Sequence, residues 1–532
     1  MGRALRNIGI VSGVTMASRV LGLGRDVAIT AVFGASALAS AFVTAFTLPN
    51  LFRRLLGEGA LTAALVPTLQ EETKARGTGG AHALVNQVAT WTLLASGVIT
   101  VTAMAVLAAR GWWAPRLEAA GWEADTVARW AMGAGLGVVL FPYLVTVCLA
   151  AVFSAALQIQ GRFLEPALNP VWLNLSILGL LGAGVWSVAG DDAAARMHWL
   201  CAGVLLGGVL QMVVPALALR RLGWRPRFAA ERSAGVRQIA RLMVPTLFGS
   251  AIYLINTTVS RLLGLSLDDA AATVLNLSTR LMELPIGVFA LAVATVVFPQ
   301  IAKHAAEGRM DQLAEDYGKG MRLILLVNVP AAFGLAVLAE PITRVLFERG
   351  AFTAQDTAVM APVLAASALA LPFLAFVSLT LRAFYALKDT ATPVRVALVS
   401  FVVNVVASVA LMRGLGATGL ALASTIAVVV QAALLQVLLT RRVGGLKFRR
   451  IAPHLAKVSV ASLLMAGVVA AGWAWWGRVA GEGVGGGWEL LGLALVVGAG
   501  VAVYGGAALA LRVEGLAEMV ALVRRKLRLG GG

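Results

Sequence analysis

Arginines inside long apolar stretches are the residues of this sequence most able to do chemistry. A charged side chain at the centre of a bilayer costs about 2.5–3.5 kcal/mol on insertion scales, so it usually faces a water-filled cavity and serves a function there. A guanidinium binds phosphate oxygens through two parallel hydrogen bonds and keeps its charge. Three of them around one cavity would suit a diphosphate. The candidate residues are Arg19, Arg25, Arg53 and Arg280.

The spacing of Arg19 and Arg25 sets a condition on their helix. Six residues of regular helix turn two side chains about 120° away from each other. Gly22 and Gly24 lie between them and permit a bend or an unwound turn, which would aim both guanidiniums at one cavity. The alternative is that Arg25 and Asp26 simply lie at the outer membrane interface.

The second apolar run ends with two adjacent arginines. Arg54 and Glu58 are four residues apart and can pair along a helix, which leaves Arg53 available for an external anion. Pro49 predicts a kink just before them. The alternative is that Arg53 and Arg54 anchor the cytoplasmic end of the helix.

A third charged pair lies in the second half of the chain. Arg280 and Glu283 are three residues apart and share one helix face, so we expect an ion pair. Such a pair is either structural, or a gate in which Glu283 holds an arginine in one state and releases it in another. The segment 382–394 predicts a helix end, a short turn and a new helix near Pro393, with a structural role.

The elements that must position these residues are membrane helices. The chain has 532 residues, of which 59% are hydrophobic and 13% charged, against roughly 25% charged in soluble domains. Its apolar runs are continuous rather than alternating, which favours helices over a barrel. Each run can span a bilayer, so we expect an all-α polytopic membrane protein with about fourteen transmembrane helices. The runs are 8–33, 36–56, 84–109, 129–157, 167–189, 197–219, 242–265, 272–300, 321–339, 357–385, 393–413, 415–440, 454–476 and 487–511.

The net charge of +18 comes mainly from basic residues in the loops and the C-terminal tail. Basic residues gather after the sixth and twelfth runs and in the C-terminal tail, whereas the loops after the fifth and seventh runs are acidic, with Asp191, Asp192, Asp268 and Asp269. Lys and Arg favour the cytoplasmic side, so both termini are predicted to be cytoplasmic. The first run soon meets Arg19 and no convincing small-residue cleavage site follows, so we expect a retained helix rather than a cleaved signal. Basic loops on the cytoplasmic side account for the net positive charge, so we do not expect the protein to bind nucleic acid.

Several motifs resemble those of one known family. SRVLGLGRD at 18–26, LPNLFRRLLGEGALTAALVP at 48–67, RLMELPIGVFALAVATVVFPQ at 280–300, FERGAFT at 347–353 and FYALKDTATPV at 384–394 occur in order. Together they resemble the lipid II flippases of peptidoglycan synthesis, the MurJ or MviN family. That family shares a superfamily with the MATE multidrug exporters and the polysaccharide-unit flippases.

The resemblance implies two six-helix lobes around a cationic cavity, at 1–220 and 242–441, joined by a basic cytoplasmic linker at 221–241. Residues 442–532 would supply two further helices that form a groove for a lipid tail, and a basic tail. It implies alternating access that carries lipid II, an undecaprenyl-diphosphate-linked disaccharide pentapeptide, to the periplasmic leaflet of the bacterial inner membrane. It also implies membrane lipids as partners, and it leaves open whether cell-wall synthesis proteins bind as well.

The resemblance also assigns residues. The cavity arginines of the family match Arg19, Arg25, Arg53 and Arg280, its helix-eight carboxylate matches Glu283, and its EGA turn matches residues 58–60, which contain Glu58. Two positions depart from the family: Ser40 stands where members often carry an acid, and Thr279 where some carry Asp. A gating pair that uses those acids must be built from other residues.

Other function classes fit the sequence less well. A cation or drug antiporter of the same superfamily would need an acidic pocket, and an enzyme would need a carboxylate cluster or a catalytic base that the motifs do not offer. Cys148 and Cys201 lie in apolar runs without metal-ligand spacing, and no GxxxxGK[ST] occurs, so we expect no metal, cofactor or ATPase site. The source of energy stays open between membrane potential and an ion gradient.

Overall fold

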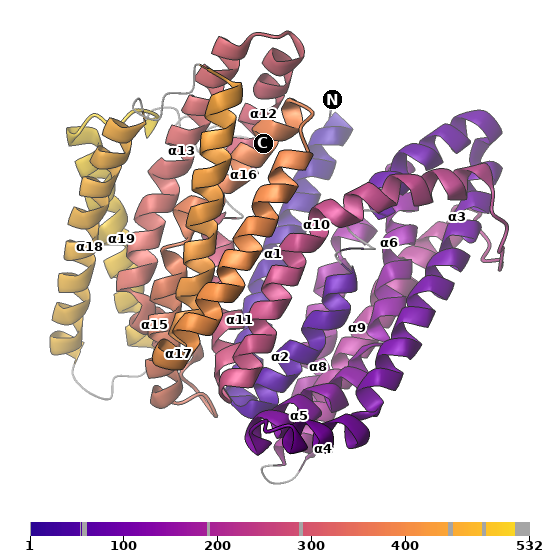
Figure 1. Cartoon of the computed structure of the whole chain (residues 1–532), viewed down its shortest axis with the longest axis horizontal. Coiled ribbons are helices and arrows are strands. Elements are labelled where there is room, and N and C mark those ends of the chain that lie inside the picture. Colours follow the sequence, from indigo (N-terminus) through magenta and orange to yellow (C-terminus); the bar gives the residue numbers. More distant parts are fainter. Residues whose placement is uncertain are drawn as a thin grey trace. The chain divides into compact units, whose positions relative to one another are not determined.

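The computed structural model describes residues 2–53, 55, 61–188, 192–286, 291–444, 451–480 and 486–516, and these residues form helices and turns without a strand (Figure 1). The chain divides into two compact units, unit 1 (Met1–Thr273) and unit 2 (Val274–Gly532). The helices up to the boundary are α1 (Gly2–Phe33), α2 (Ala37–Phe52), α3 (Thr62–Ala108), α4 (Arg110–Ala119), α5 (Ala124–Leu140), α6 (Tyr143–Ile159), α7 (Leu164–Ala167), α8 (Asn169–Ser187), α9 (Ala193–Arg221) and α10 (Ala234–Leu267). Helix α11 (Ala271–Pro285) crosses it, and α12 (Leu291–Ala306), α13 (Met310–Val337), α14 (Ala339–Phe347), α15 (Ala354–Ala368), α16 (Leu371–Ala386), α17 (Ala391–Arg442), α18 (Ala452–Ala480) and α19 (Gly486–Ala510) follow.

The all-helical membrane fold is confirmed. Every described stretch of the fourteen apolar runs is mainly helical. Among the described residues, eight helices are long and apolar enough to cross a membrane, or nine if the bent pair α5 and α6 counts as one. The count of fourteen is consistent with these helices and stays a prediction.

Glycine explains why one long helix carries two predicted runs. Helix α17 contains both 393–413 and 415–440, and at Gly416 its backbone takes φ +57°, a conformation that L side chains rarely adopt. A Cβ on Gly419 would lie 2.4 Å from the carbonyl oxygen of Leu411, so the chain folds back closely here. The two runs are therefore two helical segments joined at a sharp glycine turn.

Helix α10 packs within unit 1, against α2, α3 and α5. Its start is fixed by Ser233, whose side chain accepts a hydrogen bond from the amide of Val236, and its C-terminal end lies beside α5. The predicted lobe boundaries at 220 and 242 come from the resemblance and stay a prediction. What the compact units show is that the seventh predicted span is built into the same unit as the first six.

Each unit has its own apolar core. In unit 1, α2, α5, α6, α8 and α9 bury a cluster that includes Phe42 and Tyr143. In unit 2, α13, α16 and α17 pack around Tyr317, whose hydroxyl bonds to Thr380 and Gln436 at 2.8 Å each. A buried phenol with both partners satisfied fixes the register of these three helices.

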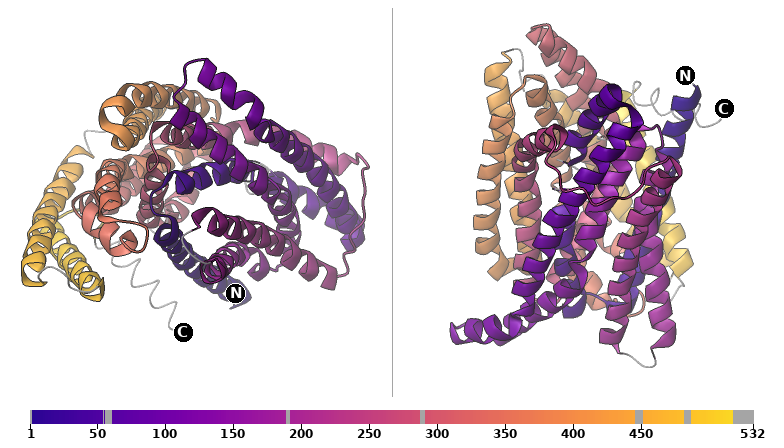
Figure 2. Two further views of the ribbon diagram at one scale, coloured as in Figure 1. Left: turned by 90° about the horizontal axis from the view of Figure 1, so that it is seen from below. Right: turned by 90° about the vertical axis from the view of Figure 1, so that its right-hand side faces the viewer.

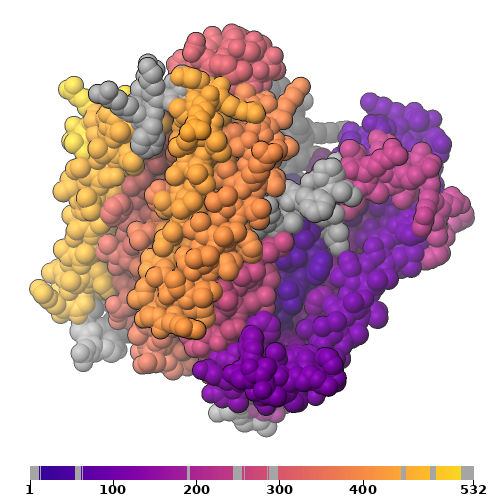
Figure 3. Space-filling model, in the orientation of Figure 1, coloured from indigo at the N-terminus to yellow at the C-terminus, as the bar shows by residue number. Residues whose placement is uncertain are grey.

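An exposed apolar stripe lies on the first segment of α17, before Gly416. The residues of α17 are orange in Figure 3. Side chains spaced by four and three residues are between 52% and 63% exposed, and they are Leu398, Val402, Val406 and Val409. Such a stripe on a helix is normally turned to a core. Its exposure here is that expected of a surface facing lipid.

The last two helices form a hairpin that is tied to α13. Helices α18 and α19, yellow in Figure 2, lie side by side. The hydroxyl of Tyr504 donates to the carbonyl of Leu326 at 2.6 Å, and a ring nitrogen of His454 lies 3.1 Å from the carbonyl of Arg322. The pair is thus fastened to unit 2. Its use as a lipid-tail groove stays a prediction.

Candidate functional site

Arg25 is buried and held from two helices. Its Nη2 and Nε donate to Oδ1 of Asp26 at 2.6 and 3.0 Å, and its Nη1 donates to the side-chain oxygen of Asn174 in α8 at 3.1 Å. The amide of Asn174 in turn donates to the carbonyl of Ser18 at 3.1 Å. Three of the five N–H groups of the guanidinium are therefore engaged, and the other two make no bond among the residues that the structure describes.

The surroundings of Arg19 differ from those of Arg25. Helix α1 continues without a break through Gly22 and Gly24, so the unwound turn that these glycines permit is not formed. Arg25 faces Asn174, whereas Arg19, six residues earlier, is half-buried on another side of the helix. Within the part of the chain that the structure describes, the Arg19 side chain makes no hydrogen bond or ion pair. An unpaired guanidinium in an apolar helix is the feature expected of a ligand contact.

Arg53 follows directly after α2. Its Nε donates to the side-chain oxygen of Asn50 at 2.7 Å, and its side chain is half-buried. Arg54 and Glu58, the pair expected beside it, lie outside the described residues.

Arg280 and Glu283 form the expected ion pair in α11. The Nη1 of Arg280 lies 3.2 Å from Oε2 of Glu283, with side chains 36% and 49% exposed. The i,i+3 spacing is therefore confirmed as a contact. Where water surrounds such a partly exposed pair, it contributes only about 0–1 kcal/mol.

Ser40 closes a contact between α2 and the start of α11. The hydroxyl is fully buried, donates to the carbonyl of Asp269 at 2.6 Å and accepts from the amide of Thr273 at 3.2 Å. A helix N-terminus exposes unsatisfied amides that an acid or a hydroxyl can cap. Ser40 thus supplies a cap where the family pattern suggests an acid.

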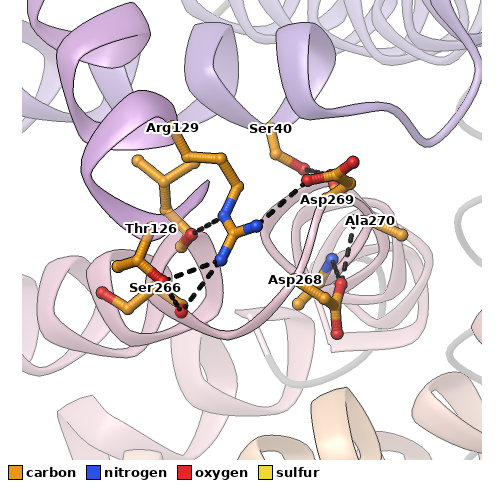
Figure 4. Close-up of polar contacts among 9 residues, drawn as sticks. Ser40, Thr126, Arg129, Ser266, Asp268, Asp269 and Ala270 are labelled. Atoms are coloured by element: carbon orange, nitrogen blue, oxygen red, sulfur yellow. Dashed lines mark hydrogen bonds and ion pairs between the residues drawn. The ribbon is translucent and has the colours of Figure 1, made fainter. Parts of the chain in front are cut away.

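Arg129 of α5 lies at the same end of unit 1 and was not anticipated from the sequence (Figure 4). Its Nε and Nη2 donate to the carbonyls of Leu265 and Ser266, at 3.0 and 3.3 Å, and its Nη1 lies 3.3 Å from Oδ1 of Asp269. The Nη2 also donates to the hydroxyl of Thr126 at 3.0 Å. A cation on the last carbonyls of a helix satisfies them and complements the helix dipole.

The remaining contacts of this cluster order the turn between α10 and α11. The side chain of Asp268 accepts from the amides of Ala270 and Ala271 at 2.9 and 2.7 Å, which starts α11 (Figure 4). The indole of Trp130 donates to the Ser266 hydroxyl at 2.9 Å. We call the set Arg129, Ser40 and the turn at 265–273 the α10–α11 latch. No local pattern could reveal its contacts between helices, because those partners are 136 to 233 residues apart.

The comparisons with known proteins identify the family. The model of the family "Lipid II flippase MurJ" matches residues 29–478, which is most of the chain. The chain belongs to the MurJ family. A probable lipid II flippase MurJ of Rhizobium meliloti is 33% identical over 81% of this chain and 79% of its own length, and one of Vibrio cholerae is 31% identical over 89% of both.

Solved structures agree with the MurJ fold. A lipid II flippase MurJ in an inward closed conformation matches with a TM-score of 0.73 at 24% identity, covering 94% of this chain and 98% of that one. A MATE multidrug transporter of the MOP superfamily matches with a TM-score of 0.62 at 14% identity, covering 82% and 98%. At these identities the match concerns the fold alone.

The candidate arginines divide between the two units. Arg19, Arg25 and Arg53 lie in unit 1, and Arg280 with Glu283 lies in unit 2. Their convergence on one cavity stays a prediction of the MurJ resemblance. Within unit 1, the guanidinium of Arg25 is engaged by its neighbours, whereas that of Arg19 makes no bond among the described residues.

Proposed function

We propose that this protein is a lipid II flippase of the bacterial cytoplasmic membrane, a transporter rather than an enzyme, with both termini in the cytoplasm. The observation that carries the proposal is the membership of the MurJ family over residues 29–478, together with the arginines that its membrane helices contain. Relatives named as lipid II flippases cover about four fifths or more of this chain.

In this proposal the arginines bind the diphosphate of the lipid. Arg19 provides a charge that no described neighbour neutralises, and Arg25 presents its two remaining N–H groups from a fixed position. Arg53 and Arg280 complete the site, with Glu283, and the Arg54–Glu58 pair beside Arg53, exchanging partners as access alternates. Phosphate is favoured over a cation because the site is built from guanidiniums.

Complementation of flippase-depleted cells tests the residues. We expect Arg19→Ala, Arg25→Ala and Arg280→Ala to fail to support growth while reaching the membrane in normal amounts. Arg116→Ala is the matched control, because Arg116 is exposed on α4 and donates to its own helix at Trp112. Full rescue by all three cavity variants would refute the site.

Reconstitution separates the function from the residues. Purified protein in liposomes should move labelled lipid II between leaflets, and imposed membrane potential, proton and sodium gradients would show which one accelerates the movement. A protein that exports cationic drugs, and leaves lipid II in place, would instead be the antiporter of the same superfamily.

A further inference from the structure

The connector between α9 and α10 is tied along one face of α3. The side chain of Asn86 donates to the carbonyl of Arg225 at 3.0 Å and accepts from the amide of Arg227 at 3.3 Å. The hydroxyl of Thr90 accepts from the amide of Ala229 at 3.0 Å. Gln87 continues the series by accepting from the Ser233 hydroxyl at 2.6 Å. These bonds give the basic connector a fixed course rather than that of a loose loop.

The connector leads to a cavity of about 370 Å³ inside unit 1. Its walls come from α3, α6 and the first turns of α10, and its surface is almost entirely apolar. Val88, Trp91, Cys148, Ile239 and Met243 line it. A cavity of this size and character suits a hydrocarbon chain, and it falls in the range of ligand pockets.

Two arginines line the same cavity. Arg232 and Arg237 are exposed, and the Arg232 guanidinium lies 5.1 Å from the centre of the Trp91 ring. The nearest acid in sequence, Glu231, accepts instead from Gln87 at 3.1 Å. Across the described ranges neither arginine forms an ion pair with a carboxylate. The cavity therefore combines an apolar interior with two cations that have no carboxylate partner among the described residues.

We propose that this cavity binds an anionic phospholipid as a resident ligand, separate from the transported lipid. One acyl chain occupies the apolar space, and the phosphate contacts Arg232 and Arg237. The basic connector is predicted to lie on the cytoplasmic side, where anionic headgroups attract arginines and basic pockets between membrane helices bind acidic lipids. A soluble anion would leave the apolar walls unfilled, and a zwitterionic lipid would leave the charge of the arginines only partly neutralised.

Native mass spectrometry of the purified protein with phosphatidylglycerol tests the proposal. Each arginine near an anionic headgroup strengthens binding several-fold, so R232Q/R237Q should bind phosphatidylglycerol about 30-fold more weakly. The control R220Q/R221Q removes the same charge from the end of α9, outside the cavity, and should stay within about two-fold of the unaltered protein. Ala240→Trp, which fills the cavity and keeps both arginines, should also lose binding.

A second measurement tests whether the acyl chain of the lipid lies in the cavity. Phosphatidylglycerol with brominated acyl chains should quench the fluorescence of the unaltered protein more than that of Trp91→Phe, because Trp91 lines the cavity. Equal binding by R232Q/R237Q and R220Q/R221Q would overturn the proposal. So would equally tight binding of phosphatidylethanolamine, or displacement of phosphatidylglycerol by lipid II, which would assign the cavity to the substrate.

Discussion

Arg19 and Arg25 lie six residues apart in one helix, yet their surroundings differ. Arg25 is neutralised by Asp26 and fixed by Asn174, whereas Arg19 has no partner among the described residues. Hydrogen bonds to its neighbours orient a guanidinium before a ligand arrives, while a guanidinium without a partner attracts an anionic ligand by its charge. We therefore propose that Arg25 orients the diphosphate and that Arg19 supplies charge.

This division predicts how lysine behaves at the two positions. Arg25→Lys should weaken lipid II binding at least about tenfold, because an ammonium cannot hold Asp26, Asn174 and a phosphate in the same plane. Arg19→Lys keeps the charge and should retain more affinity than Arg19→Ala. Binding of lipid II to purified variants measures both. Equal affinities for Arg25→Lys and the unaltered protein would contradict the assigned role.

Asn174 is the residue on which the α1 and α8 contact depends. Asn174→Leu leaves Nη1 of Arg25 and the carbonyl of Ser18 without this partner, which costs about 1–3 kcal/mol for each buried group. We expect a lower Tm in detergent, whereas Gln160→Leu, which removes an exposed amide of unit 1, should leave Tm nearly unchanged. An unchanged Tm would mean that water replaces the amide.

At the scale of elements, the α10–α11 latch predicts a local effect. Arg129→Leu removes the charged donor from the last carbonyls of α10 and should cost about 2–4 kcal/mol. Amide hydrogen exchange over 262–273 should become faster, whereas Arg116→Leu, another arginine in a short helix of unit 1, should leave it unchanged. If exchange in this segment does not respond to Arg129→Leu, the latch does not hold the turn.

The turn between α16 and α17 predicts a dependence on pH. Burial would raise the pKa of Asp389, but hydrogen bonds from Thr392 and the charge of Arg442 outweigh it and hold that pKa below its usual value. A carboxyl whose pKa is lowered by folding contributes stability that is present above its unfolded-state pKa of about 4. This stability is lost as the pH falls from there through the lower folded-state pKa. Asp389→Asn should lower Tm at pH 7 and abolish this acid-dependent component. A Tm profile of the variant that still falls together with that of the unaltered protein would contradict it.

Elements were the most predictable level. Continuous apolar runs predicted the helices, the segment 382–394 with Pro393 predicted the turn before α17, and the i,i+3 spacing predicted the pair of Arg280 and Glu283. Contacts between distant segments were not predictable. Arg25 meets Asn174 149 residues away, and Arg129 meets Asp269 140 residues away. A single sequence contains no signal for such pairs, because many helix packings satisfy the same periodicity.

At the scale of the whole molecule, the orientation in the membrane is the main prediction. In a background with Cys148→Ala and Cys201→Ala, cysteines at Ala120 and Asp192 should react with an impermeant maleimide on intact cells. Cysteines at Arg221 and Arg441 should react only after lysis, since basic segments favour the cytoplasm. Labelling of Arg221→Cys in intact cells would invert the topology and remove the case for outward transport.

The acceptors of Arg129 have a genetic consequence. Two of its bonds end on the main-chain oxygens of Leu265 and Ser266, and every amino acid supplies that oxygen. Mutations that exchange these two side chains should thus leave this pair of bonds intact. The reverse does not hold: a strain that has lost Arg129 cannot regain the bonds by changes at 265 or 266. Suppressors should arise where a new cation can reach the same oxygens, on α5 or a neighbouring helix.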